Sequence, residues 1–287
     1  MSKIKNLSLC GGGFYGYAEI GALKELEKYK EYFDLQRISG VSVGSIVAAL
    51  YAVGYTVDEL IEKVFAMNFD DLIRDNYFTY YNLWEKYGFY NANKLEEEIE
   101  KLIADKTHIK NCTFSQIKID LTIISTNLNY QRAIYFNKEN TPDVIISHAV
   151  RMSIGYPFIM IPVLYNGDLY GDGGEFINYP ITMYKNLDET IGITFANYNE
   201  NNDGTLKNRI PINSLYDYIA SIGITMSRSA YIAQITPEYL SRSIIINITE
   251  NIDSMQFNLT DEQKKFLFNC GIKSVQEQIN KIINKDK

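Results

Sequence analysis

The sequence is poor in histidine and cysteine and contains no long apolar run. Only two histidines occur among its 287 residues, and the three cysteines are Cys10, Cys112 and Cys270. An odd number of cysteines without paired spacing argues against a disulfide framework or a zinc site, so we expect reduced, structural thiols. No apolar stretch reaches the length of a transmembrane helix, and the N-terminal stretch is too short for a signal peptide. We therefore expect a cytoplasmic protein that is soluble or peripherally associated with a membrane.

The sequence also lacks an excess of basic residues. It has 28 lysines and arginines against 35 aspartates and glutamates, which gives a net charge of −7 and a pI near 5.1. Nucleic-acid binding and polybasic docking on anionic lipid both need clustered positive charge, so this balance argues against them. The apolar content of 46% suffices for a full core. We expect one domain over residues 1–287, with a C-terminal helical segment at 255–287.

Predicted strands and helices alternate along the chain. Apolar runs bounded by turn residues predict strands, whereas apolar residues spaced by three or four predict helices. Thr56-Val-Asp-Glu59 is a capping box, which opens one of the helices. The alternation predicts an α/β protein with a layered, mostly parallel sheet. The predicted strands are 4–10, 37–41, 121–126, 133–136, 161–165, 168–170, 190–196 and 243–248, and the predicted helices are 17–29, 43–53, 57–67, 94–104, 142–152, 215–235 and 261–283.

Two of the connecting segments carry turn or loop signals. Asn166-Gly167 lies between two short predicted strands and is typical of a type I′ hairpin, in which both turn residues need a positive φ. The second of these strands leads directly into Gly171-Asp172-Gly173-Gly174. A polar loop is expected at 199–208.

Two glycine-framed turns each follow an apolar strand. The first is Gly11-Gly-Gly-Phe-Tyr-Gly16 and the second is Gly40-Val-Ser42-Val-Gly44. A Gly-x-Ser-x-Gly turn between a strand and a helix presents its serine hydroxyl on a strained elbow. A glycine-rich turn nearby offers backbone N–H groups to an oxyanion. The pair therefore indicates an acyl-transfer site.

The first turn also fits a dinucleotide-binding fingerprint, which makes a further demand on the sequence. That fingerprint needs an acidic residue at the end of the second strand. Asp34 lies before the second strand, and the end of that strand is occupied by the Ser42 turn. The sequence therefore offers no acidic residue to bind the ribose of a dinucleotide. A Walker loop is excluded because no Gly-Lys-Ser/Thr follows the glycines.

A serine nucleophile needs a base, and the histidines are poorly placed to supply it. His108 follows a predicted helix in a polar stretch, and His148 lies within another helix. In the usual order of serine hydrolases the histidine comes last, yet none follows residue 148. A Ser-His-Asp triad is therefore not expected. The alternative base is Asp172, framed by Gly171, Gly173 and Gly174, although an Asp-Gly-Gly sequence by itself is also typical of a simple turn.

Four blocks together resemble the patatin-like phospholipases. The resemblance implies a three-layer α/β fold and lipid acyl-ester hydrolysis by a Ser–Asp dyad, with no metal and no cofactor. Ser42 would be the nucleophile and Asp172 the base, while the amides of Gly11, Gly12 and Gly13 would form the oxyanion hole. The blocks, in order, are Gly11–Gly16, Gly40–Gly44, Ser153-x-x-x-Pro157 and Asp172-Gly173-Gly174, and the resemblance is clear from the first strand to about Pro180.

Two residues depart from the usual blocks. Tyr15 replaces a common arginine or lysine, and Val43 follows the nucleophile where a small residue is common. The loss of the cation removes side-chain electrostatic help near the oxyanion but leaves the backbone donors intact. Val43 is expected to crowd the elbow.

The expected activity is phospholipase A type hydrolysis of glycerophospholipid esters at a membrane or micelle surface. The same acyl-serine would also serve an acyltransferase or thioesterase, and a lipid-binding module with a decayed site is a third possibility. An aromatic-rich segment at 68–91 without a clean period is a candidate cap or lid. Its aromatic side chains could line an acyl pocket, form an interfacial patch or belong to the core.

Overall fold

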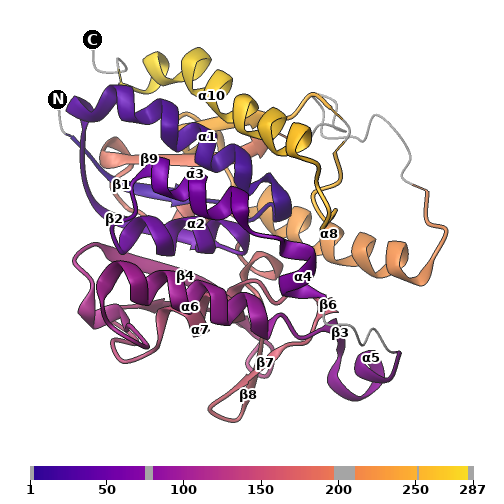
Figure 1. Cartoon of the computed structure of the whole chain (residues 1–287). Coiled ribbons are helices and arrows are strands. Elements are labelled where there is room, and N and C mark those ends of the chain that lie inside the picture. The colour runs from indigo at the N-terminus through magenta and orange to yellow at the C-terminus, as the bar shows by residue number, and fades with distance from the viewer. Residues whose placement is uncertain (1–2, 75–79, 197–210, 251, 284–287) are drawn as a thin grey trace.

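The central sheet of the computed structural model is mostly parallel and is flanked by helices (Figure 1). The model describes residues 3–74, 80–196, 211–250 and 252–283. The strand order is β10-β9-β1-β2-β4-β8-β7, and β5 also pairs with β4. Every pair from β10 to β4 is parallel, whereas β5, β8 and β7 run antiparallel to their neighbours. This arrangement confirms the predicted α/β class. The strands of this sheet are β1 (Ile4–Leu9), β2 (Phe33–Val41), β4 (Asp120–Asn127), β5 (Arg132–Asn137), β7 (Val163–Tyr165), β8 (Asp168–Asp172), β9 (Thr190–Ala196) and β10 (Ser243–Asn247), and a second small sheet pairs β3 (Gly88–Tyr90) with β6 (Phe158–Met160).

All seven predicted helices are present, and the largest difference in their bounds is at the start of α7. The predicted helix begins at Pro142, but the observed one begins at Ile146. The intervening backbone runs beside residues 112–115: Ser115 N–H donates to Pro142 O, and Thr113 forms a β-bridge with Ile145. These long-range hydrogen bonds hold the segment extended. The α-helices are α1 (Gly16–Leu26), α2 (Val43–Ala52), α3 (Val57–Ala66), α4 (Phe69–Ile73), α5 (Tyr80–Lys86), α6 (Asn93–Thr107), α7 (Ile146–Ser153), α8 (Leu215–Gln234), α9 (Pro237–Leu240) and α10 (Asp261–Ile283).

The local turn and cap signals are confirmed. Thr56 Oγ1 accepts from the amide of Glu59, whose carboxylate accepts from the amide of Thr56 in return, so α3 begins with the predicted capping box. Asn166 and Gly167 have φ values of 50° and 87°, as a type I′ turn between β7 and β8 requires. The predicted loop at 199–208 lies outside the described residues.

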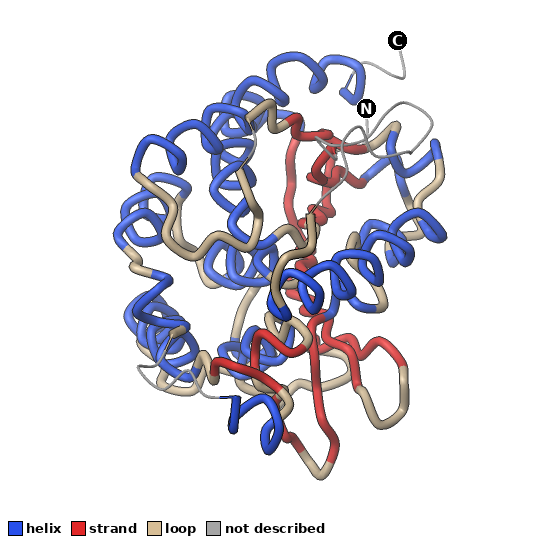
Figure 2. The backbone as a smooth tube through the Cα atoms, turned by 90° about the vertical axis from the view of Figure 1, so that its right-hand side faces the viewer, coloured by secondary structure: helices blue, strands red, loops and turns tan. Residues whose placement is uncertain are grey.

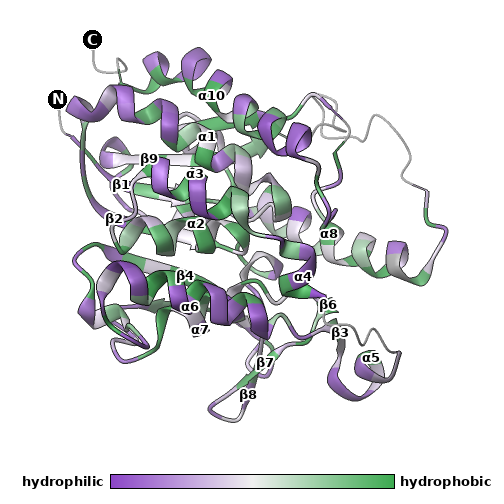
Figure 3. Cartoon of the chain, viewed as in Figure 1, coloured by the Kyte–Doolittle hydropathy of each residue, from purple (hydrophilic) through white to green (hydrophobic). Residues whose placement is uncertain are grey.

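The core lies between the sheet and its helices, which stand on either side of the strands in Figure 2. Helix α2 is buried on nearly all sides and is largely hydrophobic in Figure 3. Helices α1 and α10 pack backbone to backbone, since a Cβ added to Gly21 would lie 1.9 Å from Phe268 O and one added to Gly271 would lie 1.9 Å from Ala18 O. The three cysteines are buried and unpaired.

Helix α10 also protects the edge strand β10. Gln278 donates from its side-chain amide to Ile245 O at 2.8 Å and accepts from Ile245 N–H at 3.0 Å. Its amide group thus takes the place of a neighbouring strand, which the described residues do not supply on this side of β10. Such a contact satisfies backbone groups that would otherwise offer a template for edge-to-edge association.

The described part of the aromatic segment at 68–91 divides between core and surface, while residues 75–79 lie outside the described residues. Phe69, Phe89 and Tyr90 are buried, so part of the segment is ordinary core. The aromatic residues of α5 and the residue after it are exposed, and α5 lies on the same side of the molecule as α8 (Figure 1). The exposed fractions are 69% for Tyr80, 66% for Tyr81, 83% for Trp84 and 59% for Tyr87.

Candidate active site

Ser42 occupies a strained position between β2 and α2. Its φ is 51° and its ψ is −127°, an unfavourable backbone conformation for a residue with a Cβ. The flanking glycines are needed for close approach: a Cβ on Gly40 would lie 2.3 Å from Gly44 O, and one on Gly44 would lie 2.6 Å from Cys10 O. The two glycines thus let helix α2 pack closely against the strands, and the unfavourable dihedral angles are those of Ser42. This is the geometry of a nucleophile elbow.

Ser153 holds the elbow from the end of α7. Its buried hydroxyl accepts a hydrogen bond from Ser42 N–H at 2.9 Å and donates one to Ile124 O at 2.5 Å. Ser45 adds a second restraint, because its hydroxyl donates to Ser42 O at 2.6 Å. Ser153 was predicted only as part of a sequence block. No local pattern indicates this contact, which joins residues 111 positions apart.

Strand β4 brings Asp172 to Ser42. Val41, which precedes the serine, pairs with Ile124, and the next residue of β4, Ser125, pairs with Asp172. Asp172 is the last residue of β8 and is only 3% exposed. The two predicted catalytic side chains are therefore neighbours, although 130 positions separate them in the sequence.

The surroundings of Asp172 favour an unusually basic carboxylate. Burial raises its pKa from 3.8 to about 6, while the Ser42 hydroxyl and the amide of Gly174 oppose that rise. Oδ1 accepts from Gly174 N–H at 2.7 Å. Oδ2 is buried and accepts no hydrogen bond from the described part of the chain. Oδ2 therefore keeps its capacity to accept a proton or a hydrogen bond.

The three predicted oxyanion donors differ in their present hydrogen bonding. The amide of Gly11 donates to Asn178 O at 2.9 Å, so this donor is already engaged. The amides of Gly12 and Gly13 donate to no acceptor among the described residues. The start of α2, at Val43, adds a helix N-terminus, which favours negative charge.

Asn178 connects the first glycine turn to the Asp-Gly-Gly turn. Besides accepting from Gly11 N–H, it donates from Nδ2 to Gly11 O at 3.3 Å. A Cβ on Gly11 would lie 2.3 Å from Asn178 Oδ1, and one on Gly174 would lie 2.7 Å from it. These glycines leave the room that the asparagine fills. Sequence reasoning missed Asn178, because its role depends on a contact 167 residues away.

The two departures from the usual blocks are both packed into the structure. Tyr15 donates from its hydroxyl to Ile252 O at 2.8 Å and lies edge-on to Phe195, and burial raises its pKa to about 12. Its phenol therefore stays uncharged at neutral pH. Val43 occupies the space that a side chain at residue 16 would fill, since a Cβ on Gly16 would lie 2.5 Å from its Cγ2.

Neither histidine is a partner of Ser42 among the contacts of the described residues. His148 pairs through Nδ1 with Glu96 at 2.8 Å and packs against Tyr165. His108 ends helix α6 in a left-handed conformation. In the described ranges, no group of three or more His, Cys, Asp or Glu side chains could hold a metal ion. The helices of those ranges likewise include none with the length and hydropathy needed to span a bilayer.

The chain belongs to the patatin-like phospholipase family, whose model matches residues 7–184. It is 64% identical over 285 residues to the uncharacterized protein R571 of Acanthamoeba polyphaga mimivirus, covering 99% of this chain and 96% of that protein. It is 28% identical to the probable lipid hydrolase 463L of Invertebrate iridescent virus 6, covering 69% of this chain and 72% of the relative. The E. coli (strain TW11681) cGAMP-activated phospholipase shares 31% identity, covering 49% of this chain and 41% of that enzyme.

Solved structures share the fold. VipD from Legionella pneumophila superposes with a TM-score of 0.61 at 15% identity, covering 99% of this chain and 67% of VipD. The type III effector ExoU superposes with a TM-score of 0.56 at 16% identity. The match covers 99% of this chain, which spans only 54% of ExoU.

Proposed function

We propose that this protein is a lipid acyl hydrolase of the phospholipase A type, with Ser42 as nucleophile and Asp172 as its base. One observation carries the proposal: the buried carboxyl of Asp172 has the Ser42 hydroxyl close enough to oppose the rise of its pKa, and Ser42 itself stands on a strained elbow. Family membership and the named lipid hydrolase and phospholipase relatives support the substrate class.

The reaction begins with proton transfer from Ser42 Oγ to Asp172 Oδ2 as Oγ attacks the ester carbonyl carbon. The carbonyl oxygen becomes an oxyanion, which accepts hydrogen bonds from the amides of Gly12 and Gly13 and is favoured by the N-terminus of α2. The C–O bond to the glycerol oxygen then breaks, and Asp172 returns the proton to the departing lysolipid. Water, deprotonated by Asp172, attacks the acyl-serine and releases the fatty acid together with the free Ser42 hydroxyl.

The exposed aromatic side chains of α5 would bring the enzyme to a lipid surface. Tyr80, Tyr81 and Trp84 suit the boundary between apolar lipid and water, because each has an apolar ring and a polar atom. The net charge of −7 opposes binding to anionic membranes, so we expect binding to zwitterionic or neutral lipid. The Trp84 fluorescence shift on adding phosphatidylcholine vesicles would report this contact directly.

The test uses the wild type, Ser42→Ala and Asp172→Asn with a fluorophosphonate probe and with mixed-chain phosphatidylcholine vesicles in EDTA. Loss of both labelling and fatty-acid release in the two variants would establish the dyad, and the chain released would identify the ester attacked. Ser115→Ala, at an exposed serine of a different segment, serves as the matched control and should behave as the wild type. Product transferred to an added alcohol would indicate an acyltransferase, and a wild type that does not label would overturn the enzymatic proposal.

A further inference from the structure

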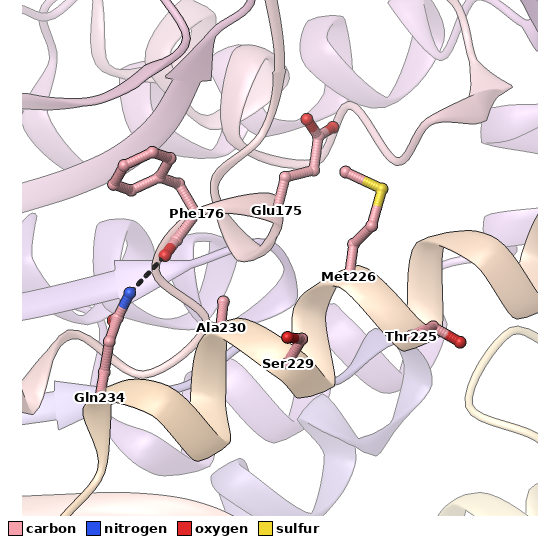
Figure 4. Close-up of a pocket in the computed structure, with 7 residues that line it drawn as sticks. All are labelled: Glu175, Phe176, Thr225, Met226, Ser229, Ala230 and Gln234. Atoms are coloured by element: carbon pink, nitrogen blue, oxygen red, sulfur yellow. Dashed lines mark hydrogen bonds between the residues drawn. The ribbon is translucent and has the colours of Figure 1, made fainter.

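A groove opens between helix α8 and the short helix that follows the proposed base. That short helix is η4 (Gly173–Glu175), and the groove has a volume of about 510 Å³. Small-molecule sites commonly measure roughly 300–1,000 Å³. Figure 4 shows Met226 reaching from α8 toward the Glu175 side chain, with Ala230 below the space between the two segments.

One end of the groove is joined to the catalytic turn. Glu175 lies three residues after Asp172, and its carboxyl packs against Gly171, where an added Cβ would lie 2.6 Å from Oε1. The other end is closed by Gln234, whose side-chain amide donates to Phe176 O at 2.7 Å (Figure 4). The lining residues of α8 extend from Thr225 to Gln234, so the groove follows α8 beside the segment that carries Glu175 and Phe176.

The lining of the groove suits an apolar occupant. Phe176 and Met226 are 44% and 43% exposed, which leaves apolar surface without cover from the described residues. No lysine, arginine or histidine lines the groove in the described structure, so a phosphate group would find no cation there. Burial and the nearby Asp172 raise the pKa of Glu175 to about 8, so its carboxyl is mostly neutral near neutral pH and offers little attraction to a cationic head group.

We propose that the groove between η4 and α8 binds the fatty-acyl chain of the substrate ester, with the chain running from Ser42 past Glu175 toward Gln234. This inference rests on the proposed function. It adds a subsite that sets acyl-chain length, because the contact between Gln234 and Phe176 limits the groove. A bulky side chain placed in the groove should therefore slow the hydrolysis of long-chain esters more than that of short-chain esters.

The test places a bulky side chain in the groove, at Ala230 or at Met226, and compares these variants with a control variant on the same helix. Ala230→Trp and Met226→Trp place an indole in the groove, whereas Ile232→Trp places one at a 61% exposed residue that does not line it. The ratio of kcat/KM for p-nitrophenyl palmitate to that for p-nitrophenyl butyrate, both below their aggregation limits, should fall about tenfold or more in each groove variant. It should stay at the wild-type value in Ile232→Trp. Circular dichroism and thermal melting would verify folding.

A binding measurement separates this inference from the proposed function. In a Ser42→Ala background, the Kd for the fluorescent fatty acid cis-parinaric acid should rise about tenfold with Ala230→Trp and not with Ile232→Trp. Equal affinities in the two variants would overturn the groove as the acyl site, even if the enzyme hydrolyses esters. Weakened binding in Ala230→Trp, together with a wild type that hydrolyses no ester, would retain the groove and reject the proposed function.

Discussion

The hydroxyl of Ser153 accepts a hydrogen bond from the backbone amide of Ser42 and simultaneously donates one to the backbone of β4. The strained serine is therefore fixed to the strand that also pairs with Asp172. Ser153, which belongs to the third block of the family pattern, thus positions the proposed nucleophile by accepting a hydrogen bond from the backbone of Ser42. The two proposed catalytic residues, which are distant in sequence, are thus both held by β4.

Replacing Ser153 should impair catalysis without removing any reacting group. We expect Ser153→Ala to lower kcat by about tenfold to a hundredfold, because the amide of Ser42 loses its buried acceptor and the elbow can shift. The measurement is kcat on a soluble ester, together with the rate of fluorophosphonate labelling. Ser147→Ala is the matched control, since Ser147 is a buried serine of the same helix whose hydroxyl donates to Glu100 instead. Equal losses in the two variants would indicate a general effect on α7.

The pH dependence should follow the proposed base. Asp172 accepts a proton only when ionised, and burial raises its pKa to about 6. Activity should therefore be full above this pH and fall about tenfold for each further unit of acidity. The profile of kcat/KM on a neutral soluble ester measures this limb. A midpoint near 4, the ordinary value for aspartate, would show that Asp172 is not the group that titrates in catalysis.

The buried charge of Asp172 should cost stability at neutral pH. Because its pKa is higher in the folded than in the unfolded chain, the stabilising contribution of its proton is complete below about 3.8 and is lost as the pH rises through about 6. The difference in unfolding free energy between Asp172→Asn and the wild type should therefore shift in favour of the variant by up to about 3 kcal/mol from acidic to neutral pH. Urea unfolding at several pH values measures this difference. Asp143→Asn, at an exposed aspartate, controls for the substitution, and a gain independent of pH would contradict the prediction.

The stability of the edge strand β10 should depend on Gln278. Gln278→Ala leaves the amide and carbonyl of Ile245 without their side-chain partner, so we expect a loss of about 1–3 kcal/mol in unfolding free energy and more aggregation on heating. Gln276→Ala, at an exposed glutamine of the same helix, should change neither property. Denaturant titration and light scattering would measure the two effects. Equal behaviour of the variants would mean that β10 needs no such cover.

The sequence by itself determined the elements whose signals are local. The capping box at Thr56 and the Asn166-Gly167 hairpin turn appear as predicted, because residues within a few positions of one another supply the required hydrogen bonds or dihedral angles. The glycine-framed turns were recognisable for the same reason. Together with the blocks at Ser153 and Asp172 they predicted the family, and the alternation of strands and helices predicted the α/β class; both are confirmed.

Only the tertiary structure decided the features that depend on distant contacts. Helix α7 begins later than predicted because residues 142–145 bond to a segment about thirty positions earlier. Ser153 and Asn178 acquired roles that no local pattern indicates, and Gly11 was found already engaged through its amide. The raised pKa of Asp172 likewise arises from burial by several strands and turns. Sequence spacing encodes local geometry, whereas burial and long-range hydrogen bonding exist only once the sheet has assembled.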